Sequence, residues 1–95
     1  MTETRLTRAV RRAGALTYKL APTTAGVPDR LVVWPGGTVD FIEVKASDGE
    51  ISPIQRERIR DLREHGANVF VLFGHPEVEE YLATRLATRL AAPIR

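Results

Sequence analysis

The sequence contains no cysteine and only two histidines, His65 and His75, which excludes several kinds of site. Without cysteine the chain forms no disulfide framework and no thiolate zinc site, and two histidines are too few for a histidine metal cluster. No apolar run approaches the ~20 residues of a membrane-spanning helix, and the N-terminus is charged where a signal peptide needs an apolar core. These absences predict a water-soluble, intracellular protein without a membrane segment.

Lysine is scarce as well. Twelve arginines and two lysines, Lys19 and Lys45, leave a net charge of +2, and the pI is near 9.5. The planar arginine fork matches two phosphate oxygens, so a small basic domain of this kind can bind nucleic acid. Arginine richness can equally follow from a GC-rich genome, and the composition alone favours neither interpretation.

The short length predicts a single domain over residues 1–95. A chain of 95 residues buries only roughly 60–65% of its extended surface on folding. It is therefore expected to be marginally stable alone or to gain stability from a second copy of itself.

Hydrophobic periodicity and turn residues predict the order helix, three strands, helix, strand, helix. One sheet with helices on both faces is the natural closure of this order. Gly74-His75-Pro76 is expected to turn the chain before the last helix. The expected strands cover 15–20, 29–34, 38–46 and 68–73, and the expected helices cover 3–13, 53–65 and 77–92.

Apolar stripes indicate the buried faces of the first and last helices. Leu6, Val10 and Ala13 form the stripe of the first helix, and Glu3 extends it by one turn, so Glu3 is expected to point inward. The last helix carries apolar residues at four-residue spacing. These cover the sheet or, as a minority alternative, support self-association: Val78, Leu82, Leu86 and Leu90.

The start of the second helix has a strong capping signature. Ser52 suits the N-cap, Pro53 suits the first helical position, and Gln55 completes a capping box. Gln55 also shares the inward stripe with Ile59 and Leu62. Its side chain is therefore expected either to cap the helix only or to reach the sheet.

The hairpin between the second and third strands decides which acids meet. Glu43 and Lys45 alternate on one face of their strand. A three-residue loop, Pro35-Gly36-Gly37, with a glycine in the left-handed region, would pair Leu31 with Phe41 and Val33 with Val39. That register places Asp29 directly opposite Glu43 on the same face.

Two carboxylates that face each other across a strand pair repel unless a cation neutralises them. A hard divalent ion, Mg²⁺ or Mn²⁺, suits carboxylate oxygens when no cysteine or histidine is near. The ammonium group of Lys45 could then orient or deprotonate water and stabilise charge developing on a phosphate. The competing interpretation is an ordinary solvated salt bridge between Glu43 and Lys45.

Four separated motifs resemble one known family. They are GVPDRLVVWPGG at 26–37, FIEVK at 41–45, the Ser-Pro-Ile-Gln helix start at 52–55 and Gly-Ala-Asn-Val-Phe-Val at 66–71. In this order and spacing they are similar to the virus-type replication-repair nuclease domain, VRR-NUC, of the PD-(D/E)xK superfamily, in its stand-alone phage or prophage form. The resemblance implies an α/β, restriction-endonuclease-like αβββαβ core with a C-terminal helix and a mixed central sheet.

The resemblance also implies a site. Asp29 corresponds to the motif aspartate, and Glu43 and Lys45 to the (D/E)xK pair. Residues implied as metal ligands are Asp29, Glu43, the carbonyl of Val44, and Glu3, directly or through water. Gln55 matches a glutamine thought to lie at the active site. Glu3 and Gln55 have structural alternatives, as a first-turn acid and as a capping residue.

Four basic residues are expected to contact DNA: Lys19, Arg30, Arg56 and Arg60. Lys19 matches a basic position of the family, but a lysine at such a position is more often simply exposed to solvent, and its role ranks below those of Gln55 and Glu3. Arg56, Arg60 and Arg63 follow one line of the second helix and could track a phosphate backbone. Because Glu57, Asp61 and Glu64 alternate with them, a salt-bridged solvated face is an equal alternative.

The expected function is Mg²⁺- or Mn²⁺-dependent hydrolysis of DNA phosphodiesters by an endonuclease, in the cytoplasm of a bacterium or a phage-infected host cell. Because specific nucleic-acid interfaces bury at least ~1,000 Å², a homodimer selective for branched or junction DNA is expected. The alternative is a non-catalytic DNA-binding or assembly module with the same fold. An RNA nuclease is disfavoured, because the six aromatic residues form no evident stacking set.

Overall fold

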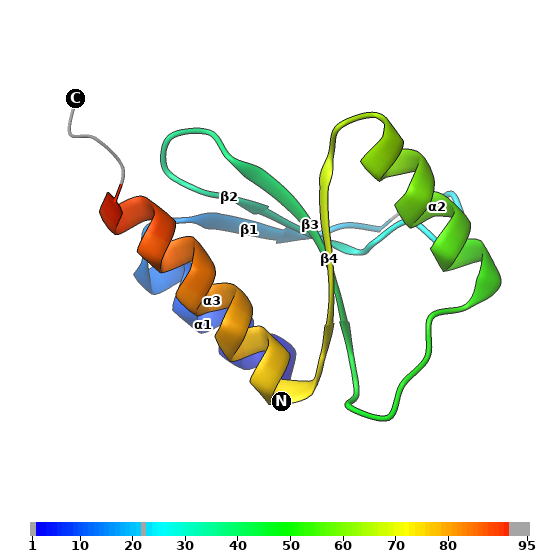
Figure 1. The fold of residues 1–95 in the computed structure, drawn as a ribbon, viewed down its shortest axis with the longest axis horizontal. Helices are drawn as coiled ribbons and strands as arrows, with labels where there is room; N and C mark the ends of the chain where they lie inside the picture. The colour runs from blue at the N-terminus through cyan, green and yellow to red at the C-terminus, as the bar shows by residue number, and fades with distance from the viewer. Residues whose placement is uncertain (1, 22, 92–95) are drawn as a thin grey trace.

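The computed structural model describes residues 2–21 and 23–91, without the side chains at 2, 3 and 88–91. Within this range, one four-stranded sheet is flanked by helices (Figure 1). The predicted order and the mixed α/β class are confirmed. The elements are α1 (Thr2–Arg12), β1 (Leu16–Lys19), β2 (Arg30–Val33), β3 (Val39–Lys45), α2 (Pro53–Glu64), β4 (Asn68–Phe73) and α3 (Gly74–Ala91).

The sheet has the strand order β1-β2-β3-β4. The β1/β2 and β2/β3 pairs are antiparallel, whereas β4 runs parallel to β3. A parallel pair needs a crossover connection, and α2 provides it. In Figure 1, α1 and α3 lie together on one side of the sheet and α2 lies on the other. Among the described residues, no helix has both the length and the hydrophobicity that crossing a bilayer requires.

The predicted hairpin register is confirmed. Leu31 pairs with Phe41 and Val33 pairs with Val39 across β2 and β3. The loop is closed by a hydrogen bond of 2.8 Å from the Trp34 N–H to the Thr38 carbonyl. Both loop glycines have positive φ, +98° at Gly36 and +97° at Gly37. These backbone conformations are strained for residues with a side chain, which explains the paired glycines.

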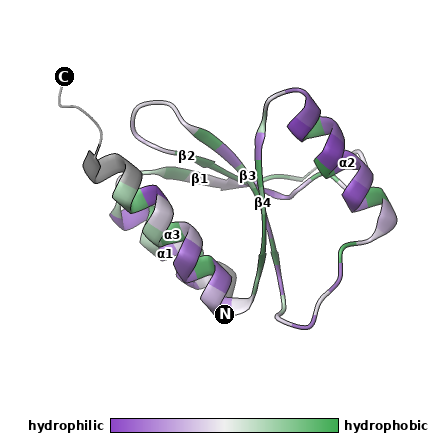
Figure 2. Cartoon of the chain, viewed as in Figure 1, coloured by the Kyte–Doolittle hydropathy of each residue, from purple (hydrophilic) through white to green (hydrophobic). Residues whose placement is uncertain are grey.

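The core lies between the sheet and the α1/α3 layer. Leu6 and Val10 of α1 are fully buried there, and Ala13 packs against them, as the apolar stripe predicts. On α3, Val78 and Leu82 are buried, but Leu86 is 37% exposed, and the side chain of Leu90 lies outside the described residues. Figure 2 shows hydrophobic residues along the strands and hydrophilic residues over much of α2.

The start of α3 corrects one sequence prediction. Gly74-His75-Pro76 is not a separate turn, because α3 begins at Gly74 directly after β4. Gly74 has φ +76° and reverses the chain at a single residue. Pro76 then fits the first helical turn, where backbone N–H groups have no intrahelical partner.

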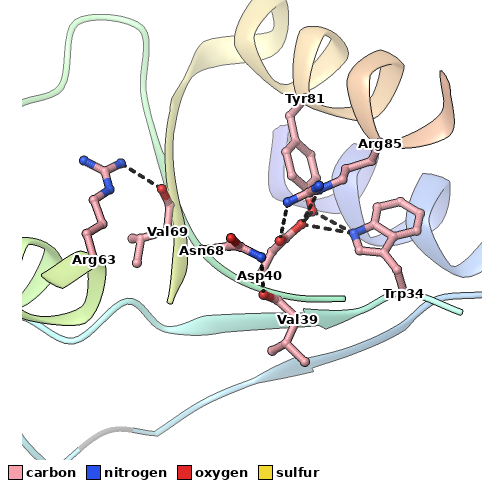
Figure 3. Close-up of polar contacts among 8 residues, drawn as sticks. All are labelled: Trp34, Val39, Asp40, Arg63, Asn68, Val69, Tyr81 and Arg85. Carbon is pink, nitrogen blue, oxygen red and sulfur yellow. Dashed lines mark hydrogen bonds and ion pairs between the residues drawn. The ribbon is translucent and has the colours of Figure 1, made fainter. Parts of the chain in front are cut away.

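A buried polar cluster fastens α3 to the sheet (Figure 3). Asp40 of β3 is fully buried. Its carboxylate accepts hydrogen bonds from Arg85 Nη2 at 2.7 Å, Arg85 Nε at 2.8 Å, the Tyr81 hydroxyl at 2.6 Å and Trp34 Nε1 at 3.1 Å. Because this buried charge is both paired and hydrogen-bonded, its desolvation is compensated. The Arg85 guanidinium also lies 5.2 Å from the Phe70 ring centroid.

Candidate active site

The acid-x-lysine pair of β3 lies on the α2 side of the sheet. Strand alternation turns Asp40 toward α3 and therefore turns Glu43 and Lys45 to the opposite face. Lys45 Nζ lies 3.8 Å from Glu43 Oε2, and the two side chains are 22% and 15% exposed. The pair is therefore shielded from water on most sides but open enough for a ligand to reach it.

Asp29 precedes β2 on the same side of the sheet. The confirmed register, with Arg30 opposite Ile42, places Asp29 opposite Glu43 when it is continued by one residue. The backbone of Asp29 continues the sheet on its other side, because its carbonyl accepts a hydrogen bond of 2.6 Å from the Leu20 N–H, directly after β1. Strand alternation and register thus place Asp29 and Glu43 on the same face at this end of the hairpin.

Gln55 fulfils both of the roles that its sequence position allows. Its Oε1 accepts a hydrogen bond from the Ser52 N–H at 3.0 Å, and its own N–H donates to Ser52 Oγ at 3.2 Å, which completes the capping box. Its Nε2 lies 3.4 Å from Glu43 Oε2. The same side chain therefore caps α2 and orients the carboxylate of Glu43.

A close backbone contact positions α2 beside the Asp29 loop. Gly26 has φ +85°, and a Cβ there would lie 2.7 Å from the Ile54 carbonyl oxygen. Only glycine allows the loop to approach the first turn of α2 so closely. Pro28, between this contact and Asp29, is fully buried. The loop and the helix start are thereby held together near the two acids.

The donor atoms at this position suit a hard divalent cation. Asp29 and Glu43 offer carboxylate oxygens, and the Val44 carbonyl is the further oxygen implied by the family. Among residues with described side chains, no group of three or more histidine, cysteine or acidic residues forms a metal cluster. The predicted ligand Glu3 lies outside that set, so its inward orientation stays a prediction.

The predicted DNA contacts separate into three groups. Arg30 is only 9% exposed, and its Nη1 donates to Thr17 Oγ1 at 3.1 Å on the face opposite Glu43. This burial argues against a DNA contact, because alternation along β2 turns Arg30 into the interior. Lys19 is exposed, but alternation along β1 places it on that same opposite face. Arg56 and Arg60 are exposed on α2.

The sequence pattern did not predict the cluster of Asp40 with Trp34, Tyr81 and Arg85. The available signal was one acid between Val39 and Phe41 in a strand whose neighbours are apolar. Burial and the hydrogen bond to Asp40 raise the pKa of Tyr81 above its usual range. The hydrogen bond to Asp40 also raises the pKa of Arg85. Both shifts keep the phenol neutral and the guanidinium charged, which suits a structural clamp away from the Glu43 site.

The fold and the acid-bearing hairpin together define a restriction-endonuclease-like α/β domain. A solved structure described as a VRR_NUC domain superimposes with a TM-score of 0.75 at 30% sequence identity, over 87% of this chain and 96% of that chain.

Sequence comparison gives the particular family. The model of the VRR-NUC domain matches residues 3–76. A protein of the Acyrthosiphon pisum secondary endosymbiont phage 1, named "Putative nuclease p44", is 43% identical over 74 residues, which are 77% of this chain and 71% of that protein. The chain belongs to the VRR-NUC family, a family of nucleases.

Proposed function

We propose that the protein is a Mg²⁺- or Mn²⁺-dependent endonuclease that hydrolyses DNA phosphodiesters. The observation that carries this proposal is the grouping of Glu43, Lys45 and Gln55 on one face, with Lys45 Nζ 3.8 Å and Gln55 Nε2 3.4 Å from Glu43 Oε2. A purely structural salt bridge between Glu43 and Lys45 would need neither the glutamine nor a second acid, Asp29, at the register position opposite Glu43.

Each residue has a separate task in this proposal. Asp29, Glu43 and the Val44 carbonyl hold the cation, with Glu3 as a further candidate ligand. The bound cation would supply Lewis acidity and lower the pKa of water. Lys45 positions the attacking water and offsets negative charge that develops on the phosphate. Gln55 restricts the rotation of the Glu43 carboxylate, so that the oxygen ligands are pre-organised.

We also propose a homodimer that acts on branched or junction DNA. The support is an uncovered part of the sheet, which we call the open sheet face, on the α2 side beyond α2 itself. α2 packs chiefly on β4. The open sheet face contains Leu16, Tyr18 and Val39, which are 55%, 53% and 38% exposed. Its remaining members are their cross-strand neighbours: Leu31, Val33 and Phe41. Exposed apolar groups of this extent are typical of interaction sites.

The similarity to the phage protein p44 supports a proposal for where the protein acts. Because p44 is a phage protein, we propose the cytoplasm of a bacterium or a phage-infected cell as the place of action. We further propose that residues 1–95 fold as one domain.

The decisive experiment is a cleavage panel. Supercoiled plasmid, linear duplex and a four-way junction are incubated with the protein in Mg²⁺, in Mn²⁺ and in EDTA. The same assays are run on Glu43→Gln and on the control Glu80→Gln, which changes an exposed residue of α3. Cleavage is expected only with metal and fastest on the junction. Glu43→Gln should lose at least about a hundredfold in rate, while Glu80→Gln keeps the wild-type rate.

Four outcomes would contradict parts of the proposal. Cleavage in EDTA, or full activity of Glu43→Gln, would overturn the assigned chemistry. Binding without cleavage in either metal would identify the non-catalytic module instead. Equal rates on the plasmid, the duplex and the junction would overturn the structure selectivity alone.

A further inference from the structure

A groove runs between α2 and β4 on the side of the sheet that carries Glu43. Its volume is about 510 Å³, within the range of ~300–1,000 Å³ of small-molecule sites. The floor is aliphatic and consists of Ile51, Ile59 and Val71. One wall carries three guanidinium groups, those of Arg56, Arg60 and Arg63, and one carboxylate, that of Glu64.

The groove adjoins the candidate active site. Val71 of its floor is the register partner of Glu43 across β3 and β4. At its other side, Ile51 and Arg56 flank the Ser52–Gln55 capping box, whose glutamine contacts Glu43. The groove thus begins one strand away from Glu43, close enough for one chain molecule to contact both.

The structure divides the arginines of the charged α2 face into one that forms ion pairs and others that form none with the described side chains. Arg58 forms ion pairs with two acids of α2: its Nη1 lies 3.1 Å from Asp61 Oδ2 and 3.9 Å from Glu57 Oε1. Arg56 and Arg60 form no ion pair with any residue whose side chain is described, and both are exposed. Their charges are thus available to an anionic ligand, as the phosphate-tracking interpretation requires.

Arg63 is held differently. Its Nη2 donates to the Val69 carbonyl of β4 at 2.7 Å (Figure 3). This bond spans from α2 to the edge strand and fixes one guanidinium at the groove. With three guanidinium groups and one carboxylate, that of Glu64, the wall carries more positive than negative charge.

We infer that this groove binds an unpaired strand of the DNA substrate next to the cleaved phosphodiester. Arginines match backbone phosphates, and an aliphatic floor accommodates the apolar face of an unstacked base. A duplex keeps its bases stacked inside and presents phosphates at its surface, so it has no group for the floor. This inference rests on the proposed function and specifies its branched substrate as one in which a strand is unpaired at the branch point.

The test measures binding separately from cleavage. Fluorescently labelled oligothymidylate and a hairpin duplex of equal nucleotide count are titrated in EDTA, and anisotropy is recorded at several salt concentrations. The variants are Arg56→Ala and Arg60→Ala. The matched control is Arg11→Ala, which removes another exposed arginine, from α1 on the other side of the sheet.

The wild type should bind oligothymidylate more tightly than the duplex. Each groove variant should weaken oligothymidylate binding by about fivefold and reduce the salt slope by roughly 0.7, whereas Arg11→Ala should bind like the wild type. Groove variants that match Arg11→Ala, or tighter binding of the duplex, would overturn the inference.

The two proposals fail in distinguishable ways. If cleavage is metal-dependent and lost in Glu43→Gln, but oligothymidylate binding is unaffected by Arg56→Ala and Arg60→Ala, the groove inference alone is wrong. If both arginine variants weaken oligothymidylate binding but no metal supports cleavage, the nuclease proposal alone is wrong. Circular dichroism of each variant verifies that it is folded.

Discussion

Gln55 connects the stability of α2 with the orientation of Glu43, and these two contributions can be separated. Gln55→Ala removes the reciprocal cap and the contact to Glu43, whereas Ser52→Ala removes only the hydroxyl acceptor of the cap. Both variants should lose about 1 kcal/mol of stability. Only Gln55→Ala should lose roughly tenfold or more in cleavage rate.

Urea denaturation and cleavage assays on both variants measure the two effects. If Ser52→Ala lowers the cleavage rate as much as Gln55→Ala does, the effect comes from helix capping. A direct role of the amide at Glu43 would then be excluded.

Ionisation of Tyr81 should make the free energy of unfolding decrease as the pH rises above 10. Burial and the hydrogen bond to Asp40 raise its pKa above the ordinary value of 10.0. The unfolded chain therefore loses this proton near pH 10 while the folded chain keeps it. The resulting stabilisation is complete below pH 10 and declines above it, by about 1.4 kcal/mol per pH unit.

The measurement is urea denaturation of the wild type and two variants between pH 8 and pH 11. Tyr81→Phe should lose about 1 kcal/mol at pH 8 and should flatten the decline above pH 10. Tyr18→Phe, at a tyrosine that is 53% exposed, is the control and should keep the wild-type profile. An unchanged profile for Tyr81→Phe would contradict the assignment.

Residue types and short spacings predicted much of the candidate site. Strand alternation paired Glu43 with Lys45, and the three-residue loop placed Asp29 in register with Glu43. The burial of Arg30 was not predicted, because it depends on Thr17 of β1, thirteen positions away. Local patterns assign a face to a side chain, but they do not say what covers that face.

At the scale of elements, the packing of the Asp29 loop on α2 determines where Gln55 meets Glu43. Gly26→Ala and Gly36→Ala both place a side chain at positive φ. Only Gly26→Ala meets backbone, at 2.7 Å from the Ile54 carbonyl oxygen, since nothing lies within 4 Å of a Cβ at Gly36. The comparison therefore isolates the contact between loop and helix from the strain of positive φ.

Gly36→Ala should cost about 1–2 kcal/mol. Gly26→Ala should cost roughly 1–3 kcal/mol more and should also lower the cleavage rate, because α2 must shift away from the loop. Thermal denaturation and cleavage assays measure both. Equal stability and equal activity of the two variants would show that the close approach has no role in the site.

The first and last residues of a helix were predictable where the capping residues lie next to them in the sequence. Ser52 and Gln55 marked the start of α2, and the His65 N–H bonds to the Asp61 and Leu62 carbonyls at its end. The start of α3 was not predicted, because one glycine at positive φ replaces a turn of three residues. The position of α3 on the sheet depends on the ion pair of Asp40 with Arg85, which are far apart in the chain.

At the scale of the whole molecule, the open sheet face predicts self-association. Leu16→Glu places a charge among the exposed apolar side chains of this face, whereas Leu86→Glu changes a leucine of α3 that is 37% exposed. Sedimentation velocity at micromolar concentration should show a dimer for the wild type and for Leu86→Glu. Leu16→Glu should sediment as a monomer, because burying an unpaired carboxylate costs several kcal/mol.

The opposite result for Leu16→Glu and Leu86→Glu would contradict this assignment of the interface. A monomeric Leu86→Glu with a dimeric Leu16→Glu would transfer the interface to the leucine edge of α3. A monomeric wild type with intact cleavage would remove the dimer from the proposed function.

The amino-acid sequence by itself determined the order of the elements, the hairpin register and the acids that share one face, because each follows from neighbours only a few residues apart. The tertiary structure alone decided that Asp40 is a buried anchor, that Arg58 pairs with the acids near Arg56 and Arg60, and that a groove lies between α2 and β4. Burial, ion pairing and concavity arise where separate elements meet, and the geometry of that packing is not encoded in any single periodic pattern.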